Sequence, residues 1–196
     1  MHKMKGDKPA LLVVDMLKGS FKKDKNLAIT PLAIQIIEPI NALIRIFREE
    51  GCPIVFPSDA FHEDSFLFSG GIKPHSLAGT EDSEVVDELD RRQEDLFLPK
   101  PSMSAFFKTD LDQWLREREV TLCAVAGLTS NFCVLATVMD ALSYNFKSVL
   151  LENCTTSFSQ EVHEKTLSIY RRNALYPLFR VCSSEELIRD LKTEMV

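Results

Sequence analysis

The stretch that decides the fold is "TLCAVAGLTSNFCVLATVMDAL", residues 121–142. From Val120 to Met139 it holds no Asp, Glu, Lys or Arg, a length that approaches that of a membrane helix. Gly127 and the polar residues 129–131 interrupt the run at its middle, which argues against a continuous helix. The stretch therefore predicts a buried strand, a turn, and the start of a buried helix.

The same alternation of short apolar runs and longer amphipathic segments fills the rest of the chain. We predict strands over residues 10–15, 53–59, 95–100, 121–127, 148–154 and 178–182. We predict helices over residues 31–50, 82–92, 109–119, 131–145, 159–174 and 184–193. Strands that are apolar nearly throughout are typical of a parallel sheet covered on both faces. The pattern predicts a doubly wound, three-layer α/β/α sandwich, and we expect one domain over residues 1–196.

Composition narrows the function classes. The formal net charge of −6 argues against a nucleic-acid-binding protein, which usually carries a basic stripe. Five cysteines without CxxC spacing make a disulfide framework or a zinc finger improbable, so a reducing compartment fits best. The start of the chain lacks an apolar run of signal-peptide length, and we expect a cytoplasmic protein without a membrane partner.

Chemically active residues stand where several predicted strands end. Asp15 ends the first, Asp59 the second, Lys100 the third, and the turn of residues 127–133 follows the fourth. In open α/β sheets, ligands bind beyond the carboxyl ends of the strands. We therefore expect a site at this edge.

Each of these residues has two interpretations. Cys133 is either a small buried hydrophobe, or a nucleophile whose pKa is lowered by the positive end of a helix, with free amides for an oxyanion. Asp15 is either a residue that caps or turns the chain or a base for the thiol, and Lys100 is either an exposed loop residue or a cation that favours thiolate.

A second candidate site lies in the longest irregular segment, residues 60–80 and their approach. Asp59, His62 and His75 are ordinary ligands for zinc or a similar divalent ion, although histidines in loops are as often surface residues. His2 and His163 lack such surroundings and are expected at the surface.

Four stretches, taken together, resemble the isochorismatase-like cysteine hydrolases, which include the nicotinamidases. These are "ALLVVDMLKGSF" (residues 10–21), "SDAFHEDSFLFSGGIKPHSLAGTEDSEVVDEL" (58–89), "KPSMSAFFKTDLDQWL" (100–115) and "VAGLTSNFCVLATVMDAL" (125–142). The resemblance runs from about residue 9 to residue 159. It departs in the second stretch, where Asp-x-x-His is one residue longer than the usual Asp-x-His, and at Thr129, where alanine is common.

The resemblance implies a six-stranded parallel sheet of Rossmann-like topology and a catalytic triad of Asp15, Lys100 and Cys133. It implies a cis peptide bond between Leu128 and Thr129, with the amides of Thr129 and Cys133 facing the oxyanion. It also implies a divalent metal, zinc by preference, as the only cofactor, and an oligomer of two or four chains.

The implied metal ligands are Asp59, His62 and His75. Phe21, Phe61 and Phe132 are candidates to sandwich a flat substrate ring, although aromatic residues more often lie in a core.

The expected activity is hydrolysis of a small amide through a thioester, with nicotinamide as the first substrate. Two alternatives stay open. One is a hydrolase of the same fold for another amide, a ureido compound or an isochorismate-like vinyl ether; the other is a binding protein without catalysis.

Overall fold

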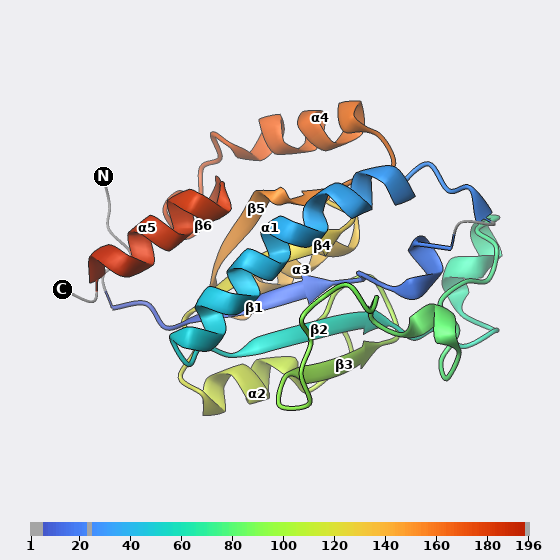
Figure 1. Cartoon of the computed structure of the whole chain (residues 1–196), viewed down its shortest axis with the longest axis horizontal. Helices are drawn as coiled ribbons and strands as arrows, with labels where there is room; N and C mark the ends of the chain where they lie inside the picture. The colour runs from blue at the N-terminus through green and yellow to red at the C-terminus, as the bar shows by residue number, and fades with distance from the viewer. Residues whose placement is uncertain (1–5, 23–24, 195–196) are drawn as a thin grey trace.

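The computed structural model describes residues 6–22 and 25–194. Its centre is a six-stranded sheet, β3-β2-β1-β4-β5-β6, in which every neighbouring pair is parallel (Figure 1). The strands are β1 Pro9–Val14, β2 Ile54–Asp59, β3 Leu96–Lys100, β4 Leu122–Leu128, β5 Lys147–Thr156 and β6 Phe179–Cys182. The predicted six-stranded parallel sheet is confirmed, and each strand lies within a few residues of its expected place.

Helices cover both faces of this sheet. The helices are α1 Thr30–Glu49, α2 Leu111–Glu117, α3 Cys133–Ser143, α4 Gln160–Tyr170 and α5 Ser184–Glu194. Side chains alternate along β1, so that Leu11 and Val13 pack with α1 and α5, while Leu12 and Val14 pack with α2, α3 and α4. By length and composition alone α1 could cross a membrane, but in this structure its apolar side packs on the sheet. The three layers match the predicted sandwich.

Residues 82–92 form no helix, contrary to prediction. Only Glu81–Ser83 make one 3-10 turn, and Val85 and Val86 continue in an extended path. The amide of Val86 donates to the carbonyl of Met16 at 2.9 Å, and Val85 pairs with Leu17 in an isolated antiparallel bridge. The apolar spacing that suggests a helix reflects burial against α1, because Val85, Val86 and Leu89 all join its core cluster. Tertiary contacts thus override the local helical pattern.

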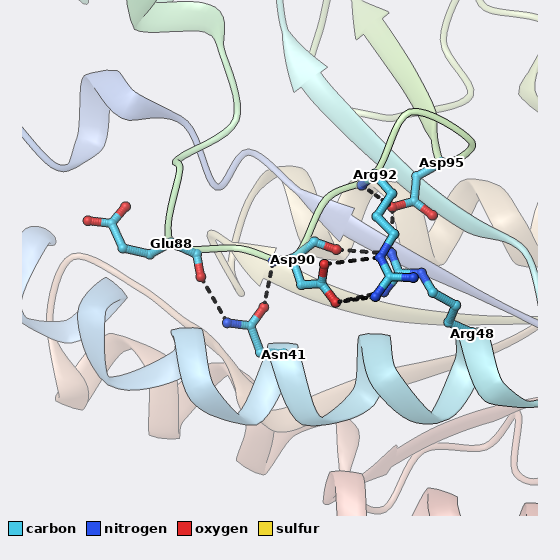
Figure 2. A network of polar contacts seen from close by, with 6 residues as sticks. All are labelled: Asn41, Arg48, Glu88, Asp90, Arg92 and Asp95. Atoms are coloured by element: carbon cyan, nitrogen blue, oxygen red, sulfur yellow. Dashed lines mark hydrogen bonds and ion pairs between the residues drawn. The ribbon is translucent and has the colours of Figure 1, made fainter.

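Polar side chains of α1 hold the segment that leads into β3 (Figure 2). Asn41 donates to the Glu88 carbonyl and accepts the Asp90 amide, both at 2.9 Å. Arg48 pairs with Asp90 at 3.0 Å and with Asp95 at 2.8 Å. These contacts fix the chain just before β3, whose last residue is Lys100.

Gly127 brings the ends of β1 and β4 together. Its φ is +103°, and a Cβ built on it would lie 2.0 Å from the carbonyl oxygen of Val14. Only glycine combines this backbone conformation with so close an approach. The residue after Val14 is Asp15, so the contact sets the distance between Asp15 and the turn that carries Cys133.

Replacing Gly127 by alanine should therefore lower the free energy of unfolding by at least about 3 kcal/mol, since backbone strain and a backbone clash add. Gly51→Ala is the matched control: its φ is also positive, at +66°, but nothing lies within 4 Å of the added Cβ. We expect it to cost only about 1–2 kcal/mol. Urea unfolding of both variants tests this, and equal losses would contradict the close contact.

Candidate active site

Four neighbouring strands bring their ends to one place. Asp15 follows β1, Asp59 ends β2, Lys100 ends β3, and Cys133 begins α3 after β4. These strands are adjacent in the order β3-β2-β1-β4, and Asp59 and Lys100 are direct register partners. The chain reverses its winding direction between β1 and β4, so the cluster lies at the crevice where ligands of such sheets bind.

Lys100 lies at the centre of the cluster. Its side chain is 0% exposed, and its ammonium has the three donors that every lysine carries. The ammonium contacts a carboxylate oxygen of Asp59, lies 2.9 Å from Asp15 Oδ2, and donates to the carbonyl of Ser102 at 3.1 Å. Although burial alone would lower the pKa of Lys100, the charges of Asp15 and Asp59 raise it overall, so the lysine stays charged.

Asp15 faces the sulfur of Cys133. Asp15 Oδ1 accepts the backbone amide of Asp59 at 2.8 Å, which fixes the orientation of the carboxylate. Oδ2 is buried and, among the described residues, receives no hydrogen bond of good geometry beside its ion pair with Lys100. Ligand atoms of Asp15, Asp59 and Cys133 all lie within 4.8 Å of one another. The structure therefore brings together the carboxylate, the ammonium and the thiol that the sequence suggests as a triad.

The thiol of Cys133 is neutral at rest, which corrects the expectation of a lowered pKa. Cys133 does begin α3, but burial raises its pKa well above 9.0, the charge of Asp15 raises it further, and Lys100 offsets only part of this. Burial and the charge of Asp15 likewise raise the pKa of Asp59 to about 8. The positive end of one helix lowers the pKa of the thiol by less than burial beside two carboxyl groups raises it. A base must therefore remove the thiol proton during the reaction.

This assignment predicts slow alkylation of Cys133 at neutral pH. A raised pKa means that the thiolate fraction is small at pH 7 and grows as the pH rises through and beyond 9.0. Iodoacetamide should therefore label Cys133 more slowly than a small-molecule thiol at pH 7, with a rate that still climbs above pH 9, as peptide mass spectrometry can measure. Labelling of Cys133 faster than the small thiol at pH 7 would instead indicate that the start of α3 lowers the pKa of Cys133.

The turn before Cys133 presents three unused amides. The peptide bond between Leu128 and Thr129 is cis, at the position that the resemblance implies. The amides of Ser130, Phe132 and Val134 donate backbone hydrogen bonds, whereas within the described chain those of Thr129, Asn131 and Cys133 donate none; the resemblance points to Thr129 and Cys133. Two free amides beside a nucleophile are the arrangement that stabilises an oxyanion.

Two further contacts hold this turn, and sequence reasoning missed both. His163 is buried in α4, contrary to the expectation of a surface residue, and its Nδ1 lies 3.1 Å from Ser130 Oγ. Ser157 donates to Asn131 at 2.6 Å. The signal for His163 was its spacing from Thr166 and Leu167, which marks the buried side of α4.

The predicted metal ligands do not come together. Asp59 points to Lys100, while His62 and His75 are exposed, and His75 Nδ1 lies 3.0 Å from the carbonyl of Lys73. Within residues 6–22 and 25–194, the one group of three metal-ligating side chains is Asp15, Asp59 and Cys133. The Lys100 ammonium contacts both carboxylates of that group, and its charge opposes a divalent cation there. The residues present thus do not fit a resident metal.

The three aromatic candidates occupy different surroundings. Phe132 is exposed directly before Cys133, Phe61 is buried, and Phe21 is half-buried against the core beneath α1. In the chain, Phe132 directly precedes Cys133 and Phe61 stands two residues after Asp59. A sandwich of all three around one ring stays a prediction.

Comparison with known proteins supplies relatives over most of the chain. The isochorismatase domain model matches residues 9–184. A "ureidoacrylate amidohydrolase RutB" from Cronobacter sakazakii is 29% identical over 174 residues, which are 76% of this chain and 75% of that protein.

Solved structures of named amidases are also similar. An N-carbamoylsarcosine amidase from Thermoplasma acidophilum has a TM-score of 0.78 and 29% identity, over 91% of this chain and 97% of its own. Nicotinamidase PncA from Bacillus subtilis has a TM-score of 0.74 and 32% identity, over 90% and 99%. A pyrazinamidase of Pyrococcus horikoshii in complex with zinc has a TM-score of 0.76 and 28% identity, over 90% and 99%.

Proposed function

Because this chain belongs to the isochorismatase family, whose domain model matches residues 9–184, we propose that it is a cysteine amidohydrolase for a small amide. One observation carries the proposal: Asp15, Lys100 and Cys133, far apart in the sequence, meet at the carboxyl edge of the sheet. The similarity to proteins named as amidases or amidohydrolases supports the same reaction class, the hydrolysis of an amide.

The reaction begins with proton transfer from the Cys133 thiol to Asp15. The sulfur then attacks the amide carbonyl carbon, and the amides of Thr129 and Cys133 hold the oxyanion that forms. Lys100 keeps the Asp15 carboxylate in place and offsets negative charge in the pocket. The C–N bond breaks as Asp15 returns the proton to the nitrogen, which releases ammonia and leaves a thioester on Cys133.

Hydrolysis of the thioester completes the cycle. Asp15 takes a proton from a water molecule, whose oxygen attacks the thioester carbonyl. The C–S bond breaks, the carboxylic acid product leaves, and the proton returns to the sulfur. Every step uses residues of this chain alone.

Two substrate classes follow from different observations. The resemblance in sequence and the similarity to nicotinamidase PncA favour nicotinamide, which would yield nicotinate and ammonia. The similarity to ureidoacrylate and N-carbamoylsarcosine amidases favours a ureido or N-carbamoyl compound. Both classes lose ammonia in the first step, but a ureido or N-carbamoyl compound leaves a thiocarbamate on Cys133, whose hydrolysis gives a carbamic acid that loses carbon dioxide. A vinyl ether substrate fits less well, because it offers Cys133 no carbonyl.

Ammonia release from a panel of purified amides tests the proposal. The panel contains nicotinamide, pyrazinamide, N-carbamoylsarcosine and ureidoacrylate, each measured with the wild type and with Cys133→Ala. We expect release from at least one compound that the alanine variant does not support. Release from none of them, or equal release by both proteins, would overturn the proposal.

Three further expectations belong to the same proposal. We propose that residues 1–196 act as one hydrolase domain. The five cysteines are free, and a reducing cytoplasmic location suits them. A homo-oligomer of two or four chains follows from the resemblance, and sedimentation of the purified protein measures it.

A further inference from the structure

An aromatic cluster lies in the segment after β2, where the sequence predicts a metal site. The rings of Phe61, Phe68 and His75 contact one another edge to face, with centroids 5.4–5.7 Å apart. Phe61 stands two residues after Asp59, in the place of the histidine of an Asp-x-His motif, and it is only 3% exposed.

Two backbone hydrogen bonds of Phe61 also hold this segment. The amide of Phe61 donates to Ser76 at 3.0 Å, and the amide of Ala78 donates to Phe61 at 2.9 Å. A carbonyl can only accept, so the contact between His75 Nδ1 and the Lys73 carbonyl places the proton on Nδ1. The ring of His75 is therefore held by packing and one hydrogen bond.

Asp59 contacts Lys100 and not the two histidines. The Lys100 ammonium is fully buried; it donates hydrogen bonds to Asp59 and to the Ser102 carbonyl, and it forms an ion pair with Asp15. With Asp59 removed, one buried N–H of the ammonium would lack a partner, and the lysine could turn away from Asp15. Asp59 thus completes the set of contacts that fixes Lys100 between two carboxyl groups.

We propose that this chain works without a resident divalent metal, and that Asp59 is a positioning residue for Lys100, while Phe61, Phe68 and His75 close the adjacent segment by ring packing. The statement about Asp59 rests on the proposed amidase function. The statement about the metal does not depend on it.

The first experiment measures metal alone. Protein purified without chelator should contain far less than one zinc, iron or manganese ion per chain by elemental mass spectrometry. Excess EDTA or zinc chloride should change the melting temperature by less than about 2 °C, since an ion that does not bind the folded state does not stabilise it. Stoichiometric metal, with a large loss of melting temperature on chelation, would overturn the first statement whether or not the chain is an amidase.

The second experiment separates positioning from ligation with three variants. Asp59→Ala removes the acceptor and should lower kcat by roughly 10²-fold with little change in KM, because misplaced catalytic groups cost about that much. Asp59→Asn keeps an oxygen acceptor for Lys100 and should restore most of kcat. His75→Phe keeps a ring in the cluster, removes the nitrogen ligand, and should retain wild-type kcat.

A metal ligand would give another pattern. Asn is a poor replacement for a ligating carboxylate, so Asp59→Asn and His75→Phe would then both lose activity together with bound metal. A wild-type kcat for Asp59→Ala would equally overturn the positioning role. The iodoacetamide rate of Cys133, measured in each variant, reports on the cluster even if no amide is turned over: Asp59→Ala should change it and His75→Phe should not.

Discussion

Cys133→Ala should lower kcat for the best amide of the panel by at least about 10⁴-fold, because no other group replaces an attacking sulfur. The geometry leaves little room for a substitute. Cys133 alone among the five cysteines shares the cluster of Asp15 and Asp59, while Cys123, Cys154 and Cys182 are buried elsewhere in the core. Stopped ammonia assays at saturating substrate measure the loss.

The protein should stay folded in this variant. The thiol rests in its neutral form beside two carboxyl groups, so its removal deletes a small side chain and breaks no ion pair. We expect a melting temperature within about 4 °C of the wild type, which corresponds to roughly 1 kcal/mol. Cys52→Ala is the matched control, since Cys52 lies at the far end of the sheet before β2 and should keep full activity. Full activity of Cys133→Ala would show that the sulfur of Cys133 is not the nucleophile.

The covered parallel sheet could be predicted from the hydrophobic pattern, whereas its six-stranded Rossmann-like topology came from the resemblance to the family. Near-continuous apolar runs such as residues 10–14 report burial on both faces, which only a covered parallel sheet provides. Residues 82–92 show the limit of this reasoning. Their apolar spacing reports burial correctly, but an isolated sequence does not reveal that Met16 and Asn41 would supply hydrogen bonds to an extended chain.

The residues of the candidate site could be predicted from the sequence, but their protonation states could not. The predicted strand ends place Asp15, Lys100 and Cys133 at one edge, and the resemblance to the family implies that they form a triad. The raised pKa of Cys133 depends on how deeply the site is buried and on a second carboxyl group, Asp59, that the sequence had assigned to a metal. Ligand sets in loops are the hardest to predict, because the path of residues 60–80 depends on ring contacts such as Phe61 with His75.

Lys100→Met should be the most damaging change to stability in the site. The substitution removes a fully buried cation and leaves Asp15 and Asp59 side by side, an uncompensated charge that costs about 3–5 kcal/mol. Lys147→Met is the matched control. Lys147 pairs with both oxygens of Asp7 at 2.9 Å at the start of β5, and because the Lys147 side chain is 36% exposed, whereas that of Lys100 is fully buried, its loss should destabilise the fold less.

The pH dependence distinguishes a lost cation from lost packing. The pKa of Asp59 is about 8 in the folded protein and 3.8 in its ordinary state, so the folded chain binds more protons than the unfolded chain between those values. Stability from this group therefore falls as pH rises across that window and levels off near pH 8. Lys100 lowers the pKa of Asp59, so in Lys100→Met the fall should continue above pH 8, and the gap to the wild type should widen there. Urea unfolding from pH 5 to pH 9 measures the gap; a constant gap of the size seen for Lys147→Met would show that the buried lysine does not hold two carboxyl groups together.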